Sequence, residues 1–364
     1  MSLKLHIKGW IIPPLFIYCL LQSSIIYAGS LTPFFKTDIF AYSEPIAVKA
    51  ALFDDGKGRY SKGKRQFAWS WLELGFLWQQ KVGFSFLRRY DYDLRFSKDT
   101  AKLYGMTVNK QDLPVGREFF VDLKTDIFHA KGLRISYNSF LFDRLKITTG
   151  LSYLQTGYFI NGDLHGRATV LAENDYDYVA DVDYQYTKDE LFDRSVNDIN
   201  GHGFSLDIDA YLDITPAWSA QFKITDLLSW IYWKNLPQTV AITTSDRKKF
   251  DSDGYIHINP TLTGREGEHS NYTQILSPRS MLNIKYSYFH YTAFIEGYYQ
   301  YDFLLWNTGC SIKTGVGNAL IKYWPKNEAV TIGYKYQKFE IEITADHFEI
   351  DKVKMFQLFI AYEF

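Results

Sequence analysis

The sequence contains few cysteines, prolines and methionines. It contains only two cysteines, ten prolines and four methionines in 364 residues. Cys19 lies in an N-terminal apolar segment, so Cys310 would be alone after processing and could form no internal disulfide. Lysine and arginine number 40 against 41 acidic residues. This balance removes the electrostatic basis for nucleic-acid binding.

Long apolar runs are also missing. After the first 30 residues there is no stretch of about 18 uncharged apolar residues, which excludes a bundle of transmembrane helices. Aromatic residues, in contrast, make up 18% of the chain. A chain with so many aromatic side chains is not disordered. A β-rich protein remains, either soluble or inserted in a membrane.

The N-terminus has the order of a secretory signal peptide. Two lysines precede an apolar stretch from Trp10 to Leu21, and small or polar residues follow as far as Ser30. Cleavage after Ala28 or Ser30 fits this order, and we assign residues 1–28 to the signal. A transmembrane anchor is the alternative, but the apolar stretch is shorter than the roughly 20 residues an anchor needs and contains two prolines.

Most of the remaining chain alternates apolar and polar residues with a period of two, which indicates β-strands with two different faces. Phe84 and Phe86, for example, fall on one face of a strand and Arg89 and Asp91 on the other. The same alternation recurs over residues 176–186, 204–214, 282–288, 330–336, 339–347 and 356–364. These lengths match the roughly 9 to 11 residues of a tilted membrane-spanning strand. Tyrosines also end the apolar faces repeatedly, as at membrane interfaces.

These patterns predict an all-β fold, an antiparallel transmembrane β-barrel of about 12–16 strands over residues 66–364. A soluble β-sandwich also alternates, but its strands are usually shorter and its core is aliphatic. Residues 29–65 are more polar, and we expect an N-terminal periplasmic extension or plug there, or an extra strand.

The last ten residues end the chain inside an alternating segment. Phe356, Leu358, Ile360, Tyr362 and Phe364 share one face. This segment resembles the closing strand of Gram-negative outer-membrane β-barrel proteins, which ends in phenylalanine with an aromatic residue two positions earlier. The resemblance implies a place in the outer membrane of a Gram-negative bacterium, contact with its lipids, and recognition of these five residues by the barrel assembly machinery.

Strands counted back from a periplasmic C-terminus assign sides to the connections. Lys188–Gly201 and Leu228–Arg279 fall outside the cell, and short turns fall in the periplasm, as barrels prefer. Lys98–Arg117 is long yet falls in the periplasm, so the count contains an error among the early strands. The segment Asp226–Lys234 either extends a strand or forms a short helix that enters the long external loop.

The polar faces predict the residues that line the lumen. Six aspartates, Asp177, Asp181, Asp183, Asp207, Asp209 and Asp213, fall on two segments that we expect to pair. Such a wall would attract cations if water fills the interior. The alternative is a polar interior whose charges are paired and confer no selectivity. The predicted lumen residues are Arg89, Asp91, Asp93, Arg95, Asp177, Asp181, Asp183, Asp207 and Asp209.

Catalytic and metal-binding patterns are weak. Residues His269, Ser270 and Asn271 are contiguous and cannot assemble a triad in space. His165 reads as a lumen residue, and Asp251–Gly254 lacks the further ligands of a calcium loop. We therefore predict no catalytic residue, no metal and no cofactor.

Together these observations predict a porin-like passive channel for small hydrophilic solutes, with a mild cation preference and with the loop Leu228–Arg279 as its gate. Such a barrel could form a homo-oligomer and would bind no nucleic acid. The first alternative is a structural or partner-binding barrel of an export or assembly system. The second is an outer-membrane hydrolase, although we expect no enzyme activity.

Overall fold

The computed structural model describes residues 31–53, 56–189, 196, 199–246, 248–254, 256–257 and 261–364. The signal peptide predicted for residues 1–28, with Cys19, lies outside this part of the chain. Within the described part, no helix is both long enough and apolar enough to cross a membrane.

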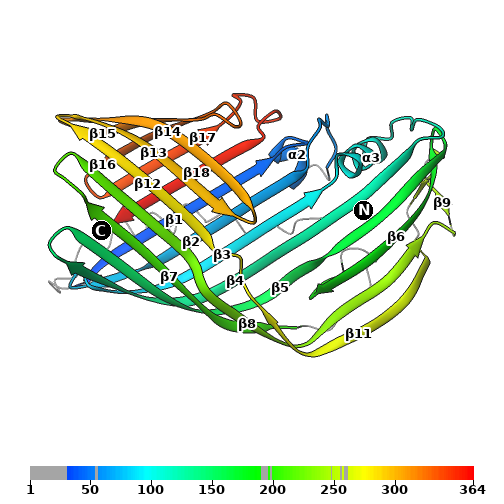
Figure 1. The fold of residues 1–364 in the computed structure, drawn as a ribbon, viewed down its shortest axis with the longest axis horizontal. Helices are drawn as coiled ribbons and strands as arrows, with labels where there is room; N and C mark the ends of the chain where they lie inside the picture. Colours follow the sequence, from blue (N-terminus) through cyan, green and yellow to red (C-terminus); the bar gives the residue numbers. More distant parts are fainter. Residues whose placement is uncertain are drawn as a thin grey trace.

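Antiparallel strands form a closed barrel (Figure 1), which confirms the predicted fold class. The helices α2 (Val48–Phe53) and α3 (Lys98–Val108) follow β1 and β3, and the short strands β9 (Lys249–Phe250) and β10 (Ile256–His257) follow β8. The strands of the main sheet are β1 (Leu31–Ser43), β2 (Arg65–Trp78), β3 (Val82–Phe96), β4 (Glu118–Leu141), β5 (Leu145–Ala172), β6 (Asp175–Tyr186), β7 (Gly201–Asp213), β8 (Trp218–Thr244), β11 (Thr261–Gln274), β12 (Arg279–Tyr288), β13 (Tyr291–Gln300), β14 (Phe303–Thr314), β15 (Gly317–Trp324), β16 (Ala329–Tyr336), β17 (Phe339–Ala345) and β18 (Met355–Glu363).

The sheet contains 16 strands, but the barrel has 14 positions. Both β6 and β7 pair with β5, over residues 160–172 and 145–156 of β5 respectively, so they follow one another along one position. In the same way β11 and β12 share one side of β8. Each pair, β6 with β7 and β11 with β12, is therefore two strands along the chain but fills a single position in the wall. The barrel size falls within the predicted range of 12–16.

The barrel closes through β1. Phe34 lies opposite Glu363 of β18 and opposite Gly75 of β2, so β1 joins the last strand to the second. The barrel therefore begins at Leu31 and not at residue 66. This corrects the extension or plug that we expected for residues 29–65, because residues 31–43 form the extra strand that was the third possibility.

The two ends of the barrel differ. The start of β1 and the end of β18 lie at one end, where the amide of Phe364 donates to the carbonyl oxygen of Pro33 at 2.8 Å. We call this the short-turn end, because the turns β2–β3, β4–β5, β7–β8, β12–β13, β14–β15 and β16–β17 lie there. The connections that contain α2, α3 and β9–β10 lie at the opposite end, the long-connection end. This asymmetry agrees with the pattern expected of outer-membrane barrels.

Three connections differ from their predicted places. Lys98–Arg117 contains α3 and lies at the long-connection end. The strand count misplaced it because β4 and β5 are each one continuous strand, and because β6 and β7 together fill one position in the wall. Residues 188–201 do not connect strands at an end of the barrel, since β6 ends and β7 begins part-way along the wall, beside residues 156–160 of β5. Leu228–Arg279 is not a free loop or gate, because most of it forms β11 and the second half of β8. Asp226–Lys234 belongs to β8, as the strand alternative expected.

The two faces of the wall differ as the alternation requires. Large apolar side chains point outward and remain exposed, with Phe84 at 38%, Leu133 at 65% and Ile332 at 69% of their full accessibility. Charged side chains such as Arg89 and Asp207 point inward and are buried. We call the outward apolar surface of the strands the apolar belt. Soluble proteins rarely expose a continuous apolar surface of this extent, whereas membrane barrels require one.

Part of the wall continues beyond the belt at the long-connection end, toward the right of Figure 1. This extended wall consists of residues 118–129 of β4, 158–172 of β5, 236–244 of β8, and β6 and β11. One of its faces is covered, because Leu103 of α3 and Leu113 pack with Phe119, Ala168 and Val170. The opposite face is largely exposed and carries polar residues together with Phe120, Val179, Val240 and Ile242.

Candidate channel interior

The interior of the barrel contains buried, paired charges. Arg89 of β3 is 3% exposed, and its Nε and Nη2 donate to Oδ2 of Asp91 at 2.9 and 2.6 Å. The same guanidinium reaches β8, where Nη1 and Nη2 donate to the two carboxylate oxygens of Asp226 at 2.7 and 2.8 Å. Because β4, β5 and β7 separate β3 from β8 in the wall, this bidentate pair ties two distant parts of the barrel together.

Asp226 reaches the interior through an irregularity in β8. Its φ is 61°, in the left-handed region that aspartate tolerates better than most residues. The pairing of β7 with β8 shifts its register between Leu206 and Ile208, so β8 carries extra residues there. The Asp226 carboxylate accepts a hydrogen bond from Ser205 Oγ at 2.6 Å, and its amide donates to Oδ1 of Asp207 at 3.0 Å.

A second arginine extends this network. Arg134 of β4 lies 3.5 Å from a carboxylate oxygen of Glu73 and 3.3 Å from one of Asp207. Its path to Asp207 crosses Gly150 of β5, where an added Cβ would lie 1.8 Å from Arg134 Nη1. The glycine therefore leaves the space that the guanidinium occupies. We call Arg89, Asp91, Asp207, Asp226, Glu73 and Arg134 the interior ion network.

Gly150→Ala should destabilise the barrel by displacing this guanidinium. We expect the free energy of unfolding to fall by about 1–3 kcal/mol, because buried charged groups lose their partners. Denaturant unfolding in detergent micelles measures the change. Gly267→Ala is the matched control, since an added Cβ there meets nothing within 4 Å. Equal unfolding curves for Gly150→Ala and Gly267→Ala would contradict this role of Gly150.

The interior contains two further ion clusters. Lys322 of β15 is 3.1 Å from a carboxylate oxygen of Glu296 and 2.7 Å from one of Glu342, on β13 and β17. Arg65 of β2 donates through Nε to Oδ1 of Asp93 at 2.9 Å. Buried charges are tolerable only when they are paired in this way. The interior is therefore polar but contains few unbalanced charges.

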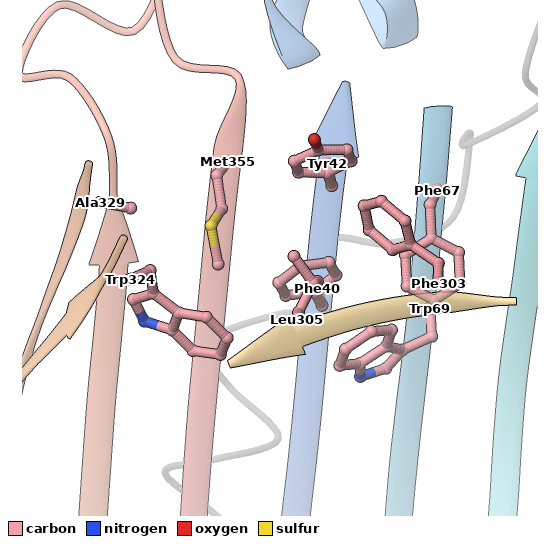
Figure 2. Close-up of a cluster of buried hydrophobic side chains, with 9 residues drawn as sticks. All are labelled: Phe40, Tyr42, Phe67, Trp69, Phe303, Leu305, Trp324, Ala329 and Met355. Atoms are coloured by element: carbon pink, nitrogen blue, oxygen red, sulfur yellow. The ribbon is translucent and has the colours of Figure 1, made fainter. Parts of the chain in front are cut away.

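Aromatic side chains cross the interior from wall to wall, as Figure 2 shows for the cluster around Phe40 and Trp324. The ring centroids of Trp69 on β2 and Tyr298 on β13 are 6.2 Å apart, and these strands stand opposite each other in the barrel. Phe67 and Phe303 bring β2 and β14 together at 6.0 Å. Opposite walls are thus in contact at this level, and the described structure is closed here.

The predicted lumen residues separate into two groups. Arg89, Asp91, Asp93 and Asp207 are buried in ion pairs of the interior, and Arg95 lies 3.0 Å from Asp93. Asp209 is also an inward residue and accepts two hydrogen bonds from Gln221 Nε2 at 2.8 and 3.1 Å. The remaining three residues, Asp177, Asp181 and Asp183, lie on β6 in the extended wall.

The single acidic wall that we expected is therefore not formed. Antiparallel pairing of residues 176–186 with residues 204–214 would have placed six aspartates on one wall. Instead β6 and β7 both pair with β5 at different heights, which distributes the acids along the barrel axis. This arrangement keeps Asp207 and Asp209 away from the acids of β6, although Asp183 still lies opposite Asp163 of β5.

The acids of β6 line an open cleft on the polar face of the extended wall. Asp181 and Asp183 lie there beside Asp163 and His165. Asp177 is close by, and its bond with the Lys248 ammonium holds its pKa below the ordinary value, so its charge is present and paired at neutral pH. Asp181 and Asp183 thus provide exposed negative charge at the long-connection end.

Several interior residues were missed at the level of sequence. The sequence places Asp226 only at the start of a segment that extends a strand or forms a short helix, and Arg279 at the end of a loop, although Arg279 lies 3.8 Å from a carboxylate oxygen of Asp91. Arg134 and Lys322 lie on the polar faces of strands, and alternation alone could have found them. No sequence pattern indicates the left-handed conformation of Asp226.

Features relevant to catalysis are sparse in the described part of the chain. His165 Nδ1 lies 3.3 Å from a carboxylate oxygen of Asp122, but both side chains are more than half exposed. His202 points outward and not into the interior. No group of three or more possible metal ligands occurs among the described residues. The side chains of His269 and Ser270 lie outside the described set.

Comparison with known proteins leaves the family open. No family model matches the chain, and no curated protein matches it. Among solved structures, a TodX monoaromatic hydrocarbon channel variant aligns over 92% of this chain and 90% of its own, with 10% identity and a TM-score of 0.44. CymD, another monoaromatic hydrocarbon channel, aligns over 92% and 87% with 8% identity and a TM-score of 0.37. The Pseudomonas putida toluene transporter TodX aligns over 91% and 89%, with 8% identity and a TM-score of 0.34. Identities and scores this low leave the substrate open.

Proposed function

We propose that this protein is an outer-membrane channel for small hydrophilic solutes whose resting state is closed by contacts across its interior. The observation that carries the proposal is the inverted distribution of side chains in a closed barrel, with charges buried inside and apolar residues exposed outside. A polar interior gives hydrophilic solutes a path only if the crossing contacts separate. The interior ion network and the aromatic cluster are therefore the gate, in place of the loop Leu228–Arg279.

The same distribution supports a location in the outer membrane of a Gram-negative bacterium. Closed β-barrels satisfy every backbone hydrogen bond in lipid, and bacterial barrels place short turns in the periplasm. The short-turn end would then face the periplasm and the extended wall would lie outside the cell. In this setting the C-terminal residues Phe356, Leu358, Ile360, Tyr362 and Phe364 would direct assembly, as their resemblance implies.

Planar-bilayer recording tests the channel directly. We expect the wild-type protein to show rare openings, because opposite walls are in contact, and a much higher open probability after Trp69→Ala, which removes the ring that meets Tyr298. Trp218→Ala is the control, because Trp218 points outward at the short-turn end. If Trp69→Ala forms a folded barrel that conducts no more than Trp218→Ala, the channel proposal is wrong.

The proposal also includes a mild preference of the open channel for cations over anions. Exposed carboxylates at a channel mouth concentrate cations, and Asp181 and Asp183 supply such charges on the extended wall. The double change Asp181→Asn/Asp183→Asn should lower the cation-to-anion permeability ratio of the open Trp69→Ala channel. Glu349→Gln, an exposed change in the β17–β18 connection, should leave it unaltered. An unchanged or raised ratio in the Asp181/Asp183 variant would remove the proposed selectivity.

A structural or partner-binding barrel is the alternative, and the filled interior is the observation that favours it. Such a barrel would need no opening, so Trp69→Ala would weaken the fold without creating conductance. The absence of enzyme activity stays a prediction.

A further inference from the structure

Two carboxyl groups face each other in the interior at the long-connection end. Asp93 of β3 lies directly opposite Asp126 of β4. Residues directly opposite in an antiparallel pair point to the same side of the sheet, with Cβ atoms about 4.5–5.5 Å apart. Asp93 is 1% exposed and Asp126 is partly buried. We call these two residues the carboxyl pair. Because like charges in this position destabilise a sheet, a proton on one of the two carboxyls stabilises the pair.

The neighbours of the carboxyl pair decide which member holds that proton. Arg65 donates through Nε to Oδ1 of Asp93 at 2.9 Å, and Arg95 Nε lies 3.0 Å from Oδ2 of Asp93. Two arginines therefore favour the charged form of Asp93, whereas Asp126 forms an ion pair with no described residue. Burial and the charges of Asp93 and Asp91 raise the pKa of Asp126 to about 7. Asp126 is thus the carboxyl that takes up and releases the proton.

The groups around Asp126 come from several parts of the barrel. The charged and titratable side chains that act on it or on which it acts are Asp91, Asp93, Arg95, Tyr272 and Tyr301. Asn161 lies opposite it on β5 and hydrogen-bonds to it. On β4 itself, Lys124 lies two residues away and is 3.4 Å from a carboxylate oxygen of Asp163. Acids outnumber bases around Asp126, so its ionisation is opposed while the barrel is closed.

The turn between β13 and β14 reaches the carboxyl pair from the opposite wall. It consists of Tyr301 and Asp302, both of which have a positive φ, 52° and 58°. Arg65, which binds Asp93 through Nε, also donates through Nη2 to the carbonyl oxygen of Tyr301 at 2.5 Å. The ring of Tyr301 packs against Phe67 of the aromatic cluster, with centroids 5.9 Å apart. We call residues 301–302 the crossing turn. Arg65 therefore connects the carboxyl pair to a contact that closes the interior.

We propose that the carboxyl pair is a proton-controlled latch, which holds the crossing turn closed while Asp126 is protonated and releases it when the proton leaves. This inference rests on the proposed channel function and adds the regulation of its gate. Once the crossing turn has moved away, water reaches Asp126 and its pKa returns toward the ordinary value of about 3.9. The closed state thus binds the proton more tightly than the open state. Raising the pH from about 5 to 7 favours opening, and the effect levels off above the pKa of the closed state.

Planar-bilayer recordings at pH 5.5 and pH 7.5 test the latch. The open probability of the wild-type protein should rise between these pH values by a factor of at least about ten. Asp126→Asn is neutral at both pH values, so it should open as rarely as wild type at pH 5.5 and lose the response. Glu118→Gln is the control, because it removes a more exposed acid from the same face of β4 and should keep the response.

Denaturant unfolding in detergent micelles measures the same proton without conductance. In the unfolded chain Asp126 has an ordinary pKa, so the folded protein must lose its extra proton as the pH rises. Between pH 5.5 and pH 7.5 the unfolding equilibrium constant of wild type should increase, relative to that of Asp126→Asn, by a factor of at least about ten. Heat-dependent gel migration confirms that each variant is a folded barrel.

The outcomes separate the latch from the channel. A wild-type open probability that does not rise with pH, or a response that persists in Asp126→Asn, would overturn the latch and leave the channel proposal standing. The same pH dependence of unfolding in wild type and in Asp126→Asn would also overturn it, because Asp126 would then hold no extra proton. Absence of conductance in every variant at both pH values would contradict the channel and the latch together.

Discussion

Arg89→Leu is expected to lower the free energy of unfolding by about 3–5 kcal/mol, because it leaves Asp91 and Asp226 buried without their shared partner. Both carboxylates are almost completely buried, at 3% and 1% exposure, so water cannot replace the guanidinium without entering the interior. The substitution also removes the link between β3 and β8, and we expect more frequent channel openings. Denaturant unfolding in micelles and planar-bilayer recording measure the two effects.

Two variants show whether charge is the cause. Arg95→Leu removes an arginine from the same strand whose side chain is 37% exposed, and it should cost less than about 1 kcal/mol. Adding Asp91→Asn and Asp226→Asn to Arg89→Leu should restore part of the lost stability, because the unpaired charges disappear. Wild-type unfolding and wild-type conductance in Arg89→Leu would show that the interior ion network holds nothing together.

Deleting residues 355–364 should abolish the folded barrel. β18 pairs with β17 on one side and with β1 on the other, so its loss leaves two open strand edges. In lipid each unpaired backbone group costs several kcal/mol, and an open sheet cannot be compensated by water. Heat-dependent gel migration and protease resistance of membrane fractions should show no folded protein.

Loss of pairing and loss of an assembly signal can be separated. Phe364→Ala leaves every pair between β18 and its neighbours in place, because the register ends at Glu363. If the terminal aromatic is an assembly signal, this variant should fold in purified form in detergent but reach the membrane poorly in cells. Assembly of the ten-residue deletion at wild-type levels would contradict closure through β18.

Alternation reveals which residues share a face but not how the strands are arranged. The faces of β3, β6, β7, β16, β17 and β18 could be predicted, because the contrast between lipid and interior acts on every second residue. The arrangement could not, because a strand interrupted part-way, such as β6 with β7, has the same pattern as two neighbouring strands. Because of this ambiguity, the alternation predicted Asp177, Asp181 and Asp183 beside Asp207 and Asp209, whereas the structure separates the two groups.

The candidate interior was predicted in part for a related reason. Arg89, Asp91 and Asp93 stand on a strand with clear alternation, and their inward direction follows from it. Their partners lie far away in sequence: Asp226 is 137 residues from Arg89 and depends on a left-handed residue in β8. Contacts across a barrel depend on the number and register of all the strands, so no local sequence pattern predicts them.

Cys310 offers the most direct test that lipid covers the apolar belt. It points outward and is exposed, with Ala293 and Ile321 as its partners on the neighbouring strands. A fluorophore on Cys310, in a Cys19→Ser background, should be quenched by lipids brominated in their acyl chains and protected from water-soluble quenchers. The same fluorophore on Asp181→Cys, in a background that also carries Cys310→Ser, should show the reverse. Free access of water-soluble quenchers to Cys310 in reconstituted vesicles, with no effect of the brominated lipids, would contradict a membrane-spanning barrel.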